Sequence, residues 1–220
     1  MRSIDEARAA ISGVLELRTG TLEIAALATL AVDPIATVIG RFRQRHPGVQ
    51  VRVVEPESAD GVRALVRDGA CELGAAHLPL PGEHLTAQPL GEQELLFVLP
   101  PAAAPEAEHP LGARELAQTP LVVSPPGTST RILLERALAD VGVTPQIAVQ
   151  IAAREAIVPL VLAGAGAALL PAPLAREAQG RGAIVRRARP AITRTVGLIH
   201  RRGPLSPAAR SFLALAANDR

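Results

Sequence analysis

The chain of 220 residues contains no Lys, no Trp and no Tyr, and only 3 Phe. Because aromatic faces stack on nucleobases and enclose cationic ligands, neither a base-stacking platform nor an aromatic cage is expected. Packing must depend on Ala, Val, Leu and Ile, and the 48% hydrophobic content suffices for a core in one domain or two small lobes. A disordered chain is therefore excluded.

The single cysteine, Cys71, excludes an internal disulfide framework and a multi-thiolate zinc site, and it fits a reducing compartment. Asp5 and Glu6 stand where the apolar core of a signal peptide would begin. We therefore expect no export and a cytoplasmic location.

All 23 basic residues are Arg, and the net charge is only +2. The charges are uneven, because residues 1–110 carry 9 Arg against 15 acidic residues, and residues 111–220 carry 14 Arg against 6. An anion-facing surface would produce this asymmetry, although scattered, solvated arginines are the simpler interpretation.

Residues 156–175 form a run of twenty residues without a charge, long enough to cross a bilayer. Pro159, Pro171 and Pro173, with Gly164 and Gly166, would repeatedly interrupt a spanning helix. The run is better interpreted as helix, glycine turn, strand and the start of a new helix. No membrane association is expected.

Strands and helices alternate along the chain after a helical segment at 1–18. In the first half, the apolar spacing predicts strands at 22–25, 49–54 and 71–76, with helices around 35–42 and from an N-cap at Ser58 to Gly69. A strand at 95–99 and a Pro-rich loop at 100–110 separate this half from a second series. That series has strands at 121–123, 147–151, 167–170 and 195–199, helices ending at Gly142 and Gly164, and a last helix opened by Ser206 and Pro207. The alternation predicts an α/β fold with parallel strands.

Motifs for nucleotide binding, metal binding or hydrolysis are absent: there is no Walker loop, H-E-x-x-H, G-x-S-x-G or C-x-x-C. Gly164-Ala165-Gly166 begins like a dinucleotide fingerprint but follows a helix and precedes a strand, the reverse of the order that pyrophosphate binding requires. The five His are widely spaced, so no metal site and no cofactor are expected.

The hydroxyl-rich segment 124–130 is the strongest candidate for a binding site. It follows a strand and opens a helix, so backbone N–H groups and the hydroxyls of Ser124, Thr128 and Ser129 would converge on a carboxylate or another small anion. The alternative is that Thr128 or Ser129 only caps the helix, and the two roles are compatible. Thr29 and Ser58 supply similar hydroxyls beyond two strands of the first half.

Several short segments that together cover about residues 18–215 carry a resemblance to a known family: 18–25, 39–49, 65–69, 72–74, 109–111, 120–122, 160–171 and 208–212. In their order and spacing, these segments resemble the effector-binding domain of LysR-type transcriptional regulators.

The resemblance implies two Rossmann-like lobes of the type II periplasmic-binding-protein kind, joined by two crossover strands, with a small-molecule effector held between them. The implied lobes are 19–93 plus 196–220 and 94–195, and residues 1–18 would be the remnant of a linker helix. It also assigns effector-lining positions to seven residues: Thr29, Ser58, Ser124, Thr128, Ser129, Ala153 and Arg154. From these hydroxyls and helix-start amides, with Arg154, we expect an organic anion as the effector.

Regulators of this family bind DNA through an N-terminal winged helix-turn-helix, which residues 1–18 could not form, so DNA binding is expected only of an intact regulator. The resemblance also implies a homodimer or tetramer. Pairing would join the helix with Ile35, Val38 and Phe42 of one subunit to the 130–140 helix of another.

Two other function classes remain open on the sequence. A free-standing solute-binding protein would share the fold but would need an export signal. An enzyme would need an acid, a base or a nucleophile beside Thr29, Ser58 or Ser124, for which His77 is the candidate partner. The leading interpretation is a sensing domain without catalysis.

Overall fold

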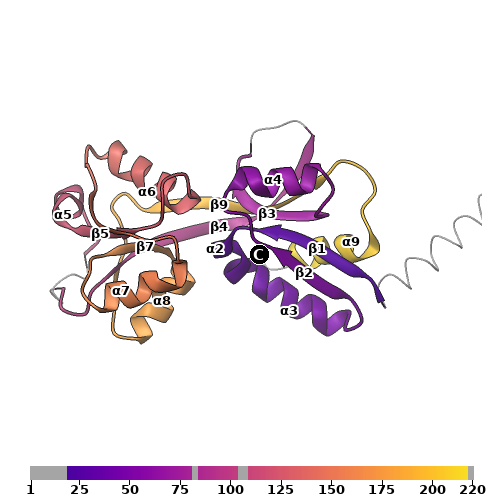
Figure 1. Cartoon of the computed structure of the whole chain (residues 1–220), viewed down its shortest axis with the longest axis horizontal. Helices are drawn as coiled ribbons and strands as arrows, with labels where there is room; N and C mark the ends of the chain where they lie inside the picture. The colour runs from indigo at the N-terminus through magenta and orange to yellow at the C-terminus, as the bar shows by residue number, and fades with distance from the viewer. Residues whose placement is uncertain (1–18, 81–83, 104–108, 218–220) are drawn as a thin grey trace, which may run out of the picture. The chain divides into compact units, whose positions relative to one another are not determined.

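The computed structural model describes residues 19–80, 84–103 and 109–217, and the expected linker helix at 1–18 lies outside them. The chain divides into two compact units, one of residues Met1–Glu92 with Thr195–Arg220 and one of Gln93–Arg194. Two long strands, β4 (Leu85–Leu99) and β9 (Ile192–Arg201), each contribute residues to both units (Figure 1).

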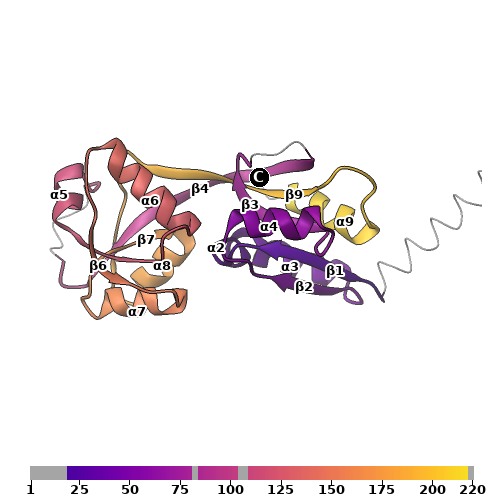
Figure 2. The same cartoon turned by 45° about the horizontal axis from the view of Figure 1, so that its top comes forward.

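The first unit is built on parallel strands with helices on both faces. β1 pairs in parallel with β2 and β3, and β3 pairs with β9 in the antiparallel direction. Figure 2 shows α4 against this sheet. Besides β9 and part of β4, the unit contains β1 (Thr21–Ala26), α2 (Ala28–Leu30), η1 (Ala31–Ile35), α3 (Ala36–Arg45), β2 (Gln50–Val54), α4 (Ala59–Arg67), β3 (Leu73–Leu78) and α9 (Pro207–Ala217).

The apolar stripe that predicted the 35–42 helix forms part of the first unit's core. Ile35, Val38 and Phe42 are each at most 1% exposed, and the Phe42 ring meets Phe212 of α9 edge-on at 5.6 Å between centroids. These three side chains therefore pack inward, and a second subunit could meet only the opposite face of α3.

The second unit has a sheet covered by helices on both faces. Its elements are α5 (Ala113–Gln118), β5 (Pro120–Val123), α6 (Ser129–Asp140), β6 (Gln146–Gln150), η2 (Arg154–Ala156), α7 (Ile157–Leu162), β7 (Ala168–Pro171), α8 (Ala172–Gly180) and β8 (Ile184–Arg186). Leu95 and Phe97 of β4 pack with α5 and α6, whereas Leu96 and Val98 pack with α7 and α8. This alternation is what a strand buried on both faces requires.

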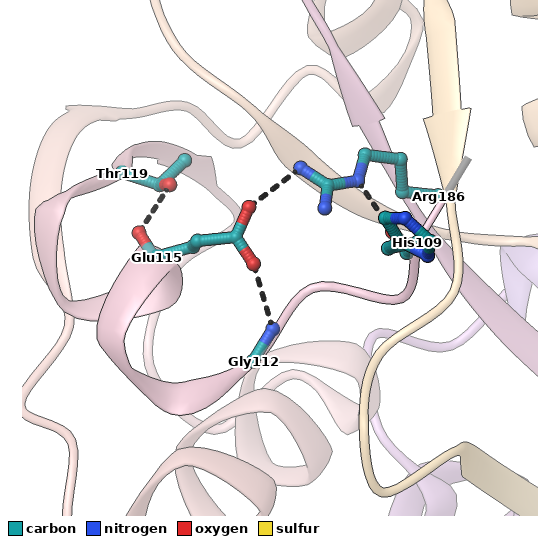
Figure 3. A network of polar contacts seen from close by, with 5 residues as sticks. All are labelled: His109, Gly112, Glu115, Thr119 and Arg186. Carbon is teal, nitrogen blue, oxygen red and sulfur yellow. Dashed lines mark hydrogen bonds and ion pairs between the residues drawn. The ribbon is translucent and has the colours of Figure 1, made fainter. Parts of the chain in front are cut away.

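A polar network fixes the start of α5 to β8 (Figure 3). Glu115 accepts a hydrogen bond from the Gly112 N–H at 3.1 Å and pairs with Arg186 Nη1 at 2.9 Å. Arg186 Nε donates to the His109 carbonyl at 2.9 Å. Hydrogen bonds of this kind occupy a helix N-terminal amide and hold the 109–112 segment in place.

The sequence predicted most elements and missed some. β4 is far longer than the predicted strand at 95–99, and α5 and β8 were not predicted, whereas α8 begins at the end of the 156–175 run, where the sequence predicted the start of a new helix. Two predicted caps are confirmed: Ser58 accepts from the Gly61 N–H at 3.2 Å, and Ser206 accepts from the Ala209 N–H at 3.0 Å. Within the described ranges, no helix has both the length and the apolar character to span a membrane.

The charge asymmetry of the two sequence halves disappears in the folded units. The unit of residues 93–194 contains 10 Arg and 8 acidic residues, and the other unit contains 13 of each. The reason is that the arginines after Thr195 return to the first unit. Neither unit is therefore strongly basic overall.

Candidate functional site

Two hydroxyls of the second unit form a pair directly after β5. Ser124 is 8% exposed, and its Oγ lies 2.7 Å from Thr128 Oγ1. Thr128 Oγ1 donates to the Pro125 carbonyl at 2.9 Å. Because each hydroxyl has a single proton, Ser124 must be the donor to Thr128 when both bonds are made.

The same pair leaves the start of α6 without a side-chain cap. Thr128 occupies the N-cap position, yet its side chain makes no capping hydrogen bond. Ser129 is the first helical residue and is half-buried. The first N–H groups of a helix have no intrahelical acceptor and carry the positive end of its dipole, so this end of α6 can receive an anionic group.

Arg154 follows β6, the strand that pairs with β5. β6 is parallel to β5, with Gln150 opposite Val123, and the Ile151 N–H extends the ladder by donating to the Val123 carbonyl at 2.9 Å. Ala153, which is exposed, and Arg154, which is half-buried, begin η2 just beyond this point. They lie beyond the same strand ends as Ser124.

A buried pair that the sequence analysis missed lies at this edge. Gln93 and Arg194 are 6% and 8% exposed, and Gln93 Oε1 accepts from Arg194 Nε at 2.8 Å and from Nη2 at 2.6 Å. In the sequence, both are polar residues just before the apolar runs at 95–99 and 195–199. That position was the available signal, but 101 residues separate them in the chain.

Strand register places this pair beside the other candidates. Gln93 precedes Leu95, which pairs with Pro171 at the carboxyl end of β7, and β4 runs antiparallel to β7. β7 is linked in parallel to β5 by the bridge from Leu121 to Ala167. The carboxyl ends of β5, β6 and β7 therefore share one edge, which is where open parallel sheets bind ligands. We call this the carboxyl edge; it carries Gln93, Ser124, Thr128, Ser129, Ala153, Arg154 and Arg194.

Electrostatics at the carboxyl edge are dominated by arginine. Burial, and then the positive charge of Arg154, lower the pKa of Arg194 to about 10. The guanidinium therefore remains charged at neutral pH. The edge combines two cations with neutral hydroxyl and amide groups, a composition suited to an anion.

The remaining predicted residues lie in the other unit. Ser58 caps α4, as the sequence predicted. Thr29 lies in the short α2 and is 9% exposed. The structure thus brings five of the seven predicted residues to the carboxyl edge and leaves Thr29 and Ser58 in the first unit.

Metal and thiol chemistry find no support in the described part of the chain. No group of three or more His, Cys, Asp or Glu side chains there could hold a metal ion. Cys71 is 1% exposed, and burial, with a smaller effect of the Glu23 charge, raises its pKa. A buried thiol of this kind behaves as a small apolar residue.

Comparison with known proteins identifies a family along nearly the whole chain. A family model described as "LysR substrate binding domain" matches residues 16–219. The HTH-type transcriptional regulator IlvR of Caulobacter vibrioides is 30% identical over 208 residues, covering 92% of this chain and 69% of IlvR.

A second relative is the phosphonates import ATP-binding protein PhnC of Anaeromyxobacter dehalogenans, which is 32% identical over 204 residues. The match covers 90% of this chain and 40% of PhnC. Among three curated relatives, PhnC included, this chain spans 40% to 58% of the relative's own length.

Solved structures share the fold. The cofactor-binding domain of the Cbl transcriptional regulator superposes with a TM-score of 0.80 at 24% identity, covering 92% of this chain and 90% of that one. The effector-binding domain of QuiR in complex with shikimate gives a TM-score of 0.74 at 17% identity, with 91% and 96% coverage. The predicted type II periplasmic-binding-protein-like α/β fold is confirmed.

Proposed function

Because the chain belongs to the LysR substrate-binding domain family, we propose that it senses a small organic anion for a transcriptional regulator. The observation that carries the proposal is the Ser124–Thr128 hydroxyl pair, which turns Thr128 away from capping α6. The amides of the first turn of α6 then remain available to a ligand oxygen.

The chemistry of the carboxyl edge supports an acid as the effector. Arg154 adds a positive charge beyond the carboxyl end of β6, and Ser124 Oγ keeps lone pairs that can accept from a hydroxyl on the ligand. QuiR, of the same fold, was solved with shikimate, which is a hydroxylated carboxylic acid. A carboxylate bound by amides and Arg154, with a hydroxyl on Ser124, fits these groups.

We propose that the domain binds its effector without catalysing a reaction. The matched family is a substrate-binding domain, and IlvR is a transcriptional regulator. An effector can shift a regulator between states only by the difference between its affinities for them. Contact with DNA would belong to a helix-turn-helix outside these 220 residues.

The test is calorimetry and thermal-shift screening with a panel of organic acids, each paired with its neutral methyl ester. We expect acids to bind and their esters to bind at least about tenfold more weakly, because the charge-assisted hydrogen bonds are lost. Ser124→Ala and Thr128→Val should weaken binding. Thr119→Val, a substitution at the half-buried C-cap of α5 in the same unit, should not. Binding only of neutral or cationic compounds would contradict the proposal.

A second copy of the chain is the partner we propose for the exposed apolar residues. Val53 and Val54 are both 42% exposed on the edge strand β2, and Ile132 and Ile147 are 40% and 41% exposed on α6 and β6. Exposed apolar edge strands are normally covered. Val53 and Val54 lie on the strand that follows α3, and Ile132 lies on α6 itself. The family resemblance implies pairing through these two helices. We propose that effector binding is transmitted by rearranging this pairing.

Light scattering at several concentrations tests the pairing. The wild type should be at least dimeric, and Val53→Lys or Ile132→Lys should shift it toward monomer. Gln118→Lys serves as the control, since Gln118 is an exposed polar residue at the end of α5. A wild type that stays monomeric at high concentration would refute this part alone.

A further inference from the structure

Arg131 is a buried cation in the first turn of α6. The residue is 6% exposed and lies with Leu134 and Leu138 on the buried stripe of the helix. It is the third helical residue, so its backbone N–H is one of the two to which an N-cap side chain would bond. The Thr128 side chain makes no such bond. Arg131 therefore belongs to the turn whose amides the proposed function assigns to the ligand.

Glu135 holds only one side of the Arg131 guanidinium. Its carboxylate accepts from Arg131 Nε at 2.6 Å, one helical turn further along α6. Arg131 Nη1 lies on the opposite side of the planar group, where it is buried and has no hydrogen-bond partner among the described residues. The hydroxyl of Thr130, the preceding residue, is likewise buried without a partner in that part of the chain. Because a buried polar group without a partner costs free energy, two of them in one helical turn require an explanation.

The start of α6 is also an electrostatically unfavourable place for a cation. The first turn of a helix carries the positive end of its dipole, which favours acidic side chains over basic ones. The first turn of α6 contains no acidic residue. The side chain of Glu135 is 44% exposed, so water weakens its attraction for Arg131. A buried arginine here adds little to the stability of α6, and local rules broken together in this way are typical of functional sites.

We infer that Arg131 binds the carboxylate of the effector together with the first-turn amides of α6, and that Glu135 is the internal counter-charge with which the ligand competes. One ion pair to a half-exposed carboxylate restrains the long Arg131 side chain only weakly, so the guanidinium can turn its Nη1 side toward an anion. Of the two carboxylate oxygens, one would accept from the amides and the other from Arg131. The inference rests on the proposed function and adds a cation in the same helical turn.

Arg131→Met separates a role in binding from a role in stability. Methionine keeps an unbranched side chain but removes the charge and every donor. We expect the melting temperature without anion to stay the same or to rise, because a buried charge is removed and the half-exposed Glu135 stays hydrated. If Arg131 served the core, the melting temperature would fall instead. Arg136→Met, at an exposed arginine of the same helix, is the matched control.

The binding experiment titrates the 220-residue chain with acetate, lactate and shikimate at pH 7.5 and constant ionic strength, each acid against its methyl ester. Calorimetry and the melting temperature report binding. We expect the wild type to bind at least one of the acids saturably. Arg131→Met should bind that acid about tenfold more weakly or worse, because a charge-assisted hydrogen bond is lost, and its affinity for the ester should not change.

Glu135→Gln provides a test in the opposite direction. The substitution removes the negative charge that competes for Arg131, so the acid should bind more tightly than it binds the wild type. A merely structural ion pair would not predict a gain in affinity. Asp140→Asn, at an exposed position at the end of the same helix, is the control. Since Glu135 is half exposed, this variant carries the test if Arg131→Met does not fold.

The outcomes separate this inference from the proposed function. Unchanged affinity of Arg131→Met for an acid that the wild type binds, or a lower affinity in Glu135→Gln, would overturn the role of Arg131 while anion sensing stands. A lower melting temperature of Arg131→Met, with equal loss of acid and ester binding, would show a structural role and would also overturn it. Binding of no acid, in this assay and in the wider panel, would overturn both.

Discussion

Ser206 donates two hydrogen bonds to Glu72, from its backbone N–H to Oε1 at 2.6 Å and from its hydroxyl to Oε2 at 2.7 Å. The same hydroxyl oxygen accepts from the Ala209 N–H at 3.0 Å and so caps α9. The carboxylate that follows the α4–β3 turn thus fixes the start of the last helix, 134 residues away.

Glu72→Gln should destabilise the chain, because an amide offers a donor where Ser206 needs an acceptor. We expect a loss of about 1–3 kcal/mol in the free energy of unfolding, as for a hydrogen bond to a charged group. Ser206→Ala removes the cap as well and should cost a similar amount. Urea unfolding measures both, with the exposed Glu55→Gln as control. Because the residues share one network, the double variant should lose less than the sum.

Glu115 should make stability depend on pH on the acid side. The Gly112 N–H and then the Arg186 guanidinium, with a minor contribution from His109, hold the pKa of this carboxyl below its ordinary value of 4.5 (Figure 3). A lowered folded pKa contributes stability that is present above the ordinary pKa and is lost as the pH falls through the folded pKa. The side chain is half exposed, so the effect is modest and weakens with salt.

The measurement is the melting temperature of Glu115→Gln against wild type from pH 7 to pH 3. The variant should melt lower at pH 7, and the two curves should converge as the pH falls below the ordinary carboxyl pKa of 4.5. Glu177→Gln, at an exposed position on α8, is the control. A difference that stays constant across the range would contradict the assignment.

Gly166 and Gly164 should respond differently to alanine. A Cβ on Gly166 would lie 2.6 Å from the Pro120 carbonyl oxygen, and its φ is +146°. Gly164 has φ +88° with nothing within 4 Å of the Cβ position. Gly164→Ala should cost roughly 1–2 kcal/mol from the left-handed backbone, and Gly166→Ala about 3 kcal/mol or more from the clash with β5. Comparable losses in urea unfolding would show that steric contact is not the cause.

Cys71 should react with thiol reagents only when the first unit opens. Its exposed fraction is 1%, and its raised pKa keeps the thiolate scarce at pH 7 to 8. Labelling with a chromogenic disulfide should therefore be slow in buffer, accelerate through the urea transition, and reach one thiol per chain when unfolded. Rapid stoichiometric labelling of the native chain would contradict this burial.

The local structure and the family could both be predicted from the amino-acid sequence. Apolar spacing located the 59–67 helix and the strands at 22–25 and 121–123, and hydroxyl residues marked the starts of α4 and α9, because these signals involve residues three or four positions apart. The hydroxyl-rich loop at 124–130 was also visible, since a strand followed by a helix places such residues at a strand's carboxyl end. Only the start of α8 was predicted, because its buried face consists only of alanine and gives little amphipathic contrast along the rest of the helix.

Contacts between residues far apart in the chain became visible in the fold alone. It showed that Ile35, Val38 and Phe42 pack inward, that Thr128 does not cap α6, and that Gln93 orients Arg194. Pairs such as this one depend on strand register and on the return of the chain after about a hundred residues. Hydrophobic periodicity indicates which face of a helix or strand is buried, but it does not indicate which polar group of another element that face will contact. For this reason Arg194 could be placed at the carboxyl edge only in the folded chain.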